Sequence, residues 1–264
     1  MEDIQHGKMR IDNLKNENMK KLLFVFITAI LATTLSAQKM DFWLDAGLKA
    51  QYGFTALYNA NTTEGNLWDN TLTSGTKYGV KLGINWNYTG ISFDIMRGKT
   101  KGLFQDVGDA SRGDREVSVE STDVYVLFRN AKHKGYFELG PKISFIGDVR
   151  TQRIGGNGET DNPNIESFYE TRNLGAVLGF GTYILGPEDG RFSGIFGLRF
   201  EYGFQDLVNS AGSAEGADRQ PVNYTGSEVG TTNPIFAGIV FELNWGIGGV
   251  GQARCGERSK FIWF

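Results

Sequence analysis

The chain of 264 residues carries 27 basic and 30 acidic side chains, so its formal net charge is −3. A charge this close to neutral indicates neither a nucleic-acid partner nor an acidic one. The single cysteine, Cys255, excludes a framework of intrachain disulfides, and the length is enough for one large domain.

The N-terminal region has the pattern of a secretory signal peptide. Met19 is followed by two lysines, by an uncharged stretch over residues 22–35 and by small residues at a cleavage position. We predict a signal peptide over residues 19–37 and interpret residues 1–18 as an upstream mis-start. A short buried helix is the alternative. No apolar stretch of 18 residues follows, so the mature chain can span a membrane only as a closed barrel.

Apolar and polar side chains then alternate in eight segments. Such alternation predicts β-strands, because successive side chains of a strand point to opposite faces. Residues 76–97 form a hairpin that we expect to turn at Thr89-Gly90. We interpret Pro141, inside one segment, as a β-bulge, because proline cannot donate to a sheet ladder. The predicted strands cover residues 42–52, 76–88, 91–97, 117–129, 137–145, 174–184, 196–205 and 235–245.

Long and short connections alternate between these segments. The long ones, over residues 55–75, 98–116, 147–170 and 206–233, are polar. Short turns on one side, long loops on the other and apolar residues outward are typical of transmembrane barrels. We therefore predict an all-β fold, an eight-stranded antiparallel up-and-down transmembrane β-barrel over residues 38–247, with both chain ends periplasmic. A secreted soluble β-sandwich is the alternative, but it does not explain the asymmetry of the loops.

Aromatic residues lie near both ends of the predicted strands. Rings of this kind form two girdles where a barrel wall meets the lipid headgroups. The girdle expected on the turn side contains Trp86, Tyr88, Phe128, Phe137 and Trp245, and the girdle expected on the loop side contains Tyr52, Tyr78 and Tyr202.

The chain resembles the small eight-stranded outer-membrane barrels of the OmpA/OmpX-like family. The resemblance covers about residues 39–247 and rests on the signal peptide, the eight alternating segments and the sequence YFELGPKISF at residues 136–145. It implies a location in the outer membrane of a Gram-negative cell more than it implies an activity. Such barrels often end on an aromatic residue, as this chain does at Phe264, but residues 248–264 follow the last predicted strand and depart from the family pattern. We interpret them as a periplasmic tail or as the product of a frame error.

Charged residues of both signs occupy the face that the barrel turns inward. The inward residues are expected to be Asp45, Lys49, Lys77, Lys81, Asp94, Glu120, Asp123, Arg129, Glu138, Lys142, Arg199, Glu201 and Glu242. An eight-stranded barrel is just wide enough for its side chains to fill it, so we predict an ion-pair network. Its central members are Lys49, Lys81, Asp94, Asp123, Lys142, Arg199, Glu201 and Glu242.

Two contacts of this network are expected from the strand order. Asp123 should lie opposite Lys142, and Gly179 and Gly181 should leave space for the guanidinium of Arg199. A polar pore or a proton path is the alternative role for the inward charges.

Catalysis has little support in the sequence. Only two histidines occur, His6 before the signal peptide and His133 in a predicted turn, so a histidine-dependent hydrolase on the barrel wall lacks its base. We predict a non-enzymatic barrel without cofactor or metal, whose partners are outer-membrane lipid and an extracellular ligand held by the four long loops. A narrow channel for ions or small solutes is one alternative and a barrel enzyme is another, and the oligomeric state is left open.

Overall fold

The computed structural model describes residues 40–59, 68–106, 113–132, 134–155, 164–187, 190–213, 230–251 and 260–263. The predicted signal peptide and the residues before it lie outside this part of the chain. No helix in the described part is both long and apolar enough to cross a membrane.

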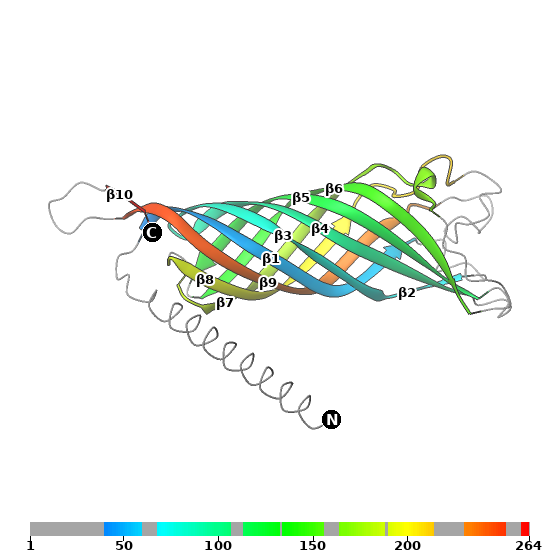
Figure 1. Cartoon of the computed structure of the whole chain (residues 1–264), viewed down its shortest axis with the longest axis horizontal. Helices are drawn as coiled ribbons and strands as arrows, with labels where there is room; N and C mark the ends of the chain where they lie inside the picture. The colour runs from blue at the N-terminus through cyan, green and yellow to red at the C-terminus, as the bar shows by residue number, and fades with distance from the viewer. Residues whose placement is uncertain are drawn as a thin grey trace, which may run out of the picture.

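Eight long strands of 12–20 residues form the wall of a closed barrel (Figure 1). Neighbours in the sequence pair antiparallel, and the first and last of the eight pair with each other to close the ring. The predicted eight-stranded up-and-down barrel is therefore confirmed. The strands are β1 (Met40–Tyr58), β3 (Thr73–Trp86), β4 (Thr89–Asp106), β5 (Asp114–Lys132), β6 (Gly135–Ile154), β7 (Arg172–Leu185), β8 (Phe192–Gly203) and β9 (Asn233–Gly251).

The first hairpin turns two residues earlier than expected. Trp86 pairs with Thr89, so Asn87 and Tyr88 form the turn and Thr89-Gly90 belongs to β4. Asn87 adopts a positive φ of 53°, a conformation that asparagine tolerates better than most residues. Because this turn contains two residues, the outward residues of β3 pair with outward residues of β4, as Leu82 does with Phe93.

The strands extend further at the loop end than the sequence analysis predicted. β4 and β5 remain paired as far as Phe104 and Arg115, and a short strand β2 (Trp68–Thr71) pairs with β4 where an irregular loop was expected. The three outward residues of β4 that follow Ile95 are charged, namely Arg97, Lys99 and Lys101. These extensions lack the apolar face that marks a lipid-facing strand, which is why they resembled loops.

The expected bulge at Pro141 is absent. Pro141 pairs with Ala176 of β7, and the β5–β6 register is the same on either side of it, from Tyr125–Lys142 to Phe128–Leu139. Pairing with β5 is simply interrupted at this point, because proline has no N–H to donate. The one register shift between β5 and β6 lies nearer the loop end, between Val119 and Ser121.

The C-terminal segment adds a strand to the end of the barrel. β9 continues to Gly251, and β10 (Lys260–Trp263) pairs with it from Gly251 to Gly248. Over this stretch β1 lies on the other side of β9. β8 does not reach it, because β8 begins at Phe192, which pairs with Trp245 of β9. β10 therefore takes the position beside β9 that β8 leaves vacant (Figure 1).

Candidate functional site

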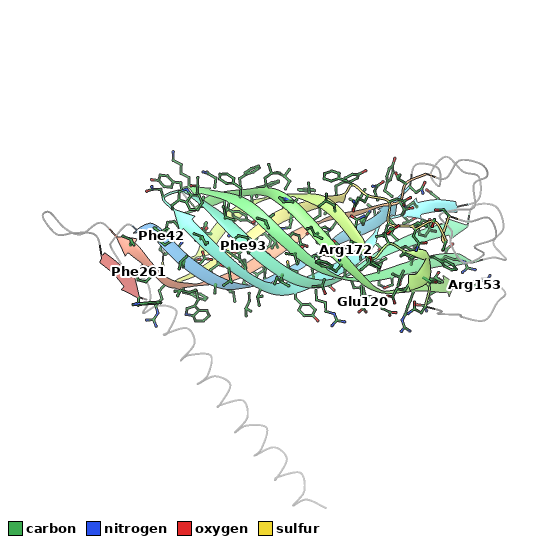
Figure 2. The ribbon with its side chains drawn as sticks, turned by 90° about the horizontal axis from the view of Figure 1, so that it is seen from above. Phe42, Phe93, Glu120, Arg153, Arg172 and Phe261 are labelled. Carbon is green, nitrogen blue, oxygen red and sulfur yellow. The ribbon has the colours of Figure 1, made fainter. Side chains whose placement is uncertain are left out.

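The outer wall of the barrel is apolar. Its strands alternate exposed apolar side chains with buried polar ones, as in β3, where Val80, Leu82 and Ile84 are exposed while Lys77 and Lys81 are buried. The outward side chains project from the wall on all sides, Phe42 and Phe93 among them (Figure 2). All eight aromatic residues expected in the girdles are exposed: Tyr52, Tyr78, Trp86, Tyr88, Phe128, Phe137, Tyr202 and Trp245.

The lumen contains charges of both signs in equal number. Six cations and six anions are buried within the described part of the chain. The cations are Lys49, Lys77, Lys81, Arg129, Lys142 and Arg199, and the anions are Asp45, Asp94, Asp123, Glu138, Glu201 and Glu242. All eight predicted central members are among these twelve residues.

One cluster of the network lies around Glu201 of β8. Its carboxylate meets the ammonium groups of Lys77 at 2.5 Å and Lys142 at 2.9 Å. Lys77 also contacts Asp123 at 2.6 Å, and the hydroxyl of Tyr125 donates to Asp123 at 3.0 Å. Asp123 was expected to lie opposite Lys142, but in the sheet it pairs with Ser144. Its carboxylate is 3.9 Å from the Lys142 ammonium, a longer distance than those of the other pairs in this cluster.

A second cluster contains both arginines. Glu138 lies between them, accepting from Arg129 at 2.7 Å and from Arg199. Arg129 also contacts both oxygens of Glu242, at 2.7 and 2.8 Å, on the far side of the lumen. Gly179 pairs with Arg199, but the side chain that occupies the space over it is that of Glu138, and Gly181 pairs with Gly197 instead. The space that was expected for the guanidinium of Arg199 is therefore filled by its carboxylate partner.

The two clusters are joined to each other and to the turn end. The amide of Gln51 can donate to Glu201 at 3.2 Å while accepting from Arg199 at 2.6 Å. Lys49 bridges Asp94 at 2.5 Å and Glu242 at 3.0 Å. Lys81 contacts Glu242 at 2.8 Å.

Toward the turn end, Lys81 also meets Asp45 at 3.1 Å. Because ions away from water are costly unless they are paired, this dense pairing is what allows twelve charges to occupy the lumen.

Glu120 was assigned to the wrong face. It is half-exposed on the outer wall, where it approaches Arg97 at 3.4 Å and Lys99 at 3.9 Å. In β5 the inward positions are odd-numbered, from Val117 to Ala131. Large apolar residues such as Tyr125 lie on that inward face too, so apolar content alone did not separate the two faces of this strand.

An apolar cluster, which we call the plug, is buried inside the loop end of the barrel, and sequence reasoning missed it. Inward residues of the strand extensions pack against two loop segments, residues 164–170 with the short helix η2 (Glu166–Phe168), and residues 204–213. The segments are joined by Tyr169–Val208 pairing and by Glu170 N–H donating to Leu207 O at 2.8 Å. The buried members are Leu57, Phe104, Val117, Val119, Val149, Ile165, Tyr169, Leu207 and Val208. In the sequence, this cluster was indicated by the alternation of its apolar members with outward residues in the strand extensions, as at Val117 and Val119.

The distribution of polarity is the reverse of that in a water-soluble barrel. The wall exposes its apolar face, and the interior holds the charges. Only lipid accommodates such a surface, and closed barrels with this alternation span outer membranes. The protein is an outer-membrane β-barrel.

Comparisons with known proteins found distant structural similarity alone and add nothing on activity. No protein-family model matches the sequence, and no curated protein matches it. Neisserial surface protein A is 14% identical, with 78% of this chain and 96% of that chain covered and a TM-score of 0.35. OprG from Pseudomonas aeruginosa is 11% identical, with 79% and 96% covered and a TM-score of 0.35. The attachment invasion locus protein Ail of Yersinia pestis is 10% identical, with 75% and 97% covered and a TM-score of 0.32.

The buried carboxylates of the barrel are held as ion-pair partners. In the described residues no group of His, Cys, Asp and Glu side chains is placed to hold a metal ion. Glu138, Glu201 and Glu242 each meet two or more cations within the lumen. These three glutamates of the described lumen are therefore paired with the barrel's own cations. His133 lies outside the described residues.

Proposed function

We propose that the protein is a non-enzymatic and non-conducting outer-membrane barrel that holds a folded platform at the cell surface. The observation that carries the proposal is the balanced lumen network, in which six buried cations meet six buried anions beneath an apolar plug. An ion crossing the barrel would have to break several of these pairs and then pass the tightly buried apolar cluster at the loop end. The alternative function, a narrow channel for ions or small solutes, is therefore disfavoured.

The platform is the part that we propose to act. The segments 164–170 and 204–213 are fixed on the strand extensions by a shared apolar core, so they hold a defined surface above the membrane. Of the four loops that we expect to bind an extracellular ligand, the loop over residues 147–170 contains the first segment and the loop over residues 206–233 contains most of the second. We propose that they bind that ligand, or that the barrel body supports the envelope.

Single-channel recording in planar bilayers tests the closed lumen. We expect no steady conductance from the wild type, from Lys81→Met inside the lumen or from the matched outer variant Lys99→Met. A steady wild-type conductance whose ion selectivity changes in Lys81→Met but not in Lys99→Met would establish a channel instead.

Incubation of the purified barrel with phospholipid vesicles or unfolded peptide tests the non-enzymatic assignment. We expect no turnover of either substrate. Turnover that persists in His133→Ala would show that an enzyme operates here without histidine.

A further inference from the structure

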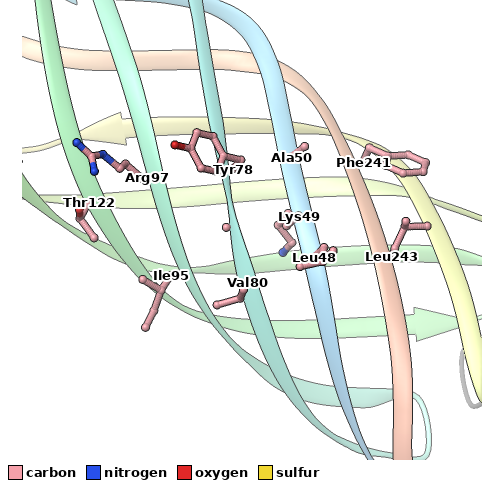
Figure 3. A pocket seen from close by; sticks show the side chains of 11 residues that line it. Leu48, Lys49, Ala50, Tyr78, Val80, Ile95, Arg97, Thr122, Phe241 and Leu243 are labelled. Carbon is pink, nitrogen blue, oxygen red and sulfur yellow. The ribbon is translucent and has the colours of Figure 1, made fainter.

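A groove crosses the lipid-facing wall over β9, β1, β3 and β4 (Figure 3). Its volume is about 590 Å³ and its lining is almost wholly apolar. The side chains that shape it are Leu48, Ala50, Tyr78, Val80, Phe241 and Leu243.

The groove exists because a small residue stands between two large rings. Ala50 pairs with Phe241 on one side and with Tyr78 on the other, so its methyl group forms the floor between their rings. The next row of the wall places Leu48 between Leu243 and Val80. Figure 3 shows these two rows crossing neighbouring strands. A channel between branched and aromatic walls has the shape and chemistry of a site for a hydrocarbon chain.

The loop-side end of the groove is cationic. Tyr78 pairs with Arg97 of β4, where the outward face changes from Ile95 to Arg97 and then Lys99. The side chains of Arg97 and Lys99 are 68% and 46% exposed. This is the level at which an apolar wall passes into the polar headgroup region.

Charge at this end is only partly balanced. Within the part of the chain that the structure describes, Glu120 is the one carboxylate paired with either cation, at 3.4 Å from Arg97 and 3.9 Å from Lys99. Lys101, further up β4, has its own partner in Glu116 at 2.8 Å. Two exposed cations that share one distant carboxylate retain a net positive charge beside the groove.

We infer that this groove binds one acyl chain of a phosphorylated membrane lipid, whose phosphate lies against Arg97 and Lys99. The apolar channel fits the chain, and the excess positive charge fits the phosphate, which guanidinium groups recognise with paired N–H donors. The inference concerns the outer wall and is independent of whether the lumen conducts.

Native mass spectrometry of the full barrel in detergent tests this site. Dioleoyl phosphatidate is the probe, and dioleoylglycerol, which has the same chains without phosphate, is its control. We expect phosphatidate to be retained at least about tenfold more tightly, which corresponds to about 1.4 kcal/mol. Ala50→Phe, which fills the groove, and Arg97→Gln, which removes the cation, should each abolish this preference.

Matched variants separate the site from general effects of the substitutions. Ala237→Phe adds a ring to the outer wall away from the groove, and Arg150→Gln removes an exposed cation beside Asp148. Both should retain the wild-type preference. Unchanged phosphatidate binding in Ala50→Phe, full competition by inorganic phosphate, or a dimer in place of a lipid adduct would each overturn the inference.

Discussion

Glu138 shows how strongly single residues of the lumen depend on one another. Its carboxylate is fully buried and is shared by Arg129 of the neighbouring strand β5 and by Arg199 of β8, which lies beyond β7 on the other side. Neither arginine can move to water, because both are buried in the closed wall. Removing this one negative charge therefore leaves an excess of positive charge that the lumen cannot disperse.

We predict that Glu138→Gln destabilises the barrel by about 3–5 kcal/mol, the cost of breaking a buried ion pair on one side. The matched variant is Glu120→Gln, which removes the same charge from an exposed cluster on the outer wall and should cost about 0–1 kcal/mol. Urea unfolding in lipid vesicles measures both. Similar costs for the two variants would show that the lumen is hydrated enough to screen its ions.

Asn209 holds the two loop segments of the plug together. Its side-chain nitrogen donates to the carbonyls of Ser167 and Tyr169, and its oxygen accepts from the N–H groups of Ala211 and Gly212. One amide thus joins the β6–β7 connection to the β8–β9 connection. The barrel strands take no part in these contacts.

We predict that Asn209→Ala loosens the plug by about 1–3 kcal/mol, because the backbone groups of both segments lose their partners. Hydrogen exchange should accelerate in residues 164–170 and 204–213, while the strands below stay protected. Ser210→Ala, at the exposed neighbouring position, is the control and should change nothing. Equal acceleration in the strands would mean that the plug and the barrel unfold as one unit.

The elements differ in how far their sequence reveals them. Strands such as β3 and β8 were predicted because lipid on one side and ions on the other impose a strict alternation of residue type. The extensions of β4 and β5 were not, because outside the membrane their outer face is polar and the constraint is lost. The plug could not be predicted either, since Ile165 and the pair Leu207-Val208 are short apolar sites in polar connections and only the fold brings them together.

The residues of the candidate site could also be predicted from the sequence only in part. The inward charges were found from their parity along each strand, and the exception, Glu120, lies in β5, where Tyr125 and Leu127 also make the inward face apolar. Individual pairs across the lumen, such as Arg129 with Glu242, depend on how eight strands close and have no signal in local sequence.

The orientation of the whole barrel wall toward lipid can be tested at one strand. Leu82 and Asn85 belong to β3, where Leu82 is exposed on the outer wall and Asn85 is buried and donates to Asp45 at 2.9 Å. We predict that Leu82→Lys costs about 2–4 kcal/mol, the cost of a cation in the lipid-facing wall. Asn85→Lys should cost less, because Asp45 can pair with the new ammonium group. Unfolding in vesicles compares the two, and a larger cost for Asn85→Lys would contradict the assigned faces.

The ion pairs that cross the lumen also constrain the order of assembly. Lys77 meets Glu201 across 124 positions of sequence and Lys81 meets Glu242 across 161, and the closing strands β1 and β9 stand at opposite ends of the barrel sequence. Contacts of such separation form late and slowly. A half-made sheet would present its lysines and glutamates to hydrocarbon without their partners. We therefore expect this chain to enter the bilayer in a single concerted event, as a nearly closed cylinder, rather than hairpin by hairpin.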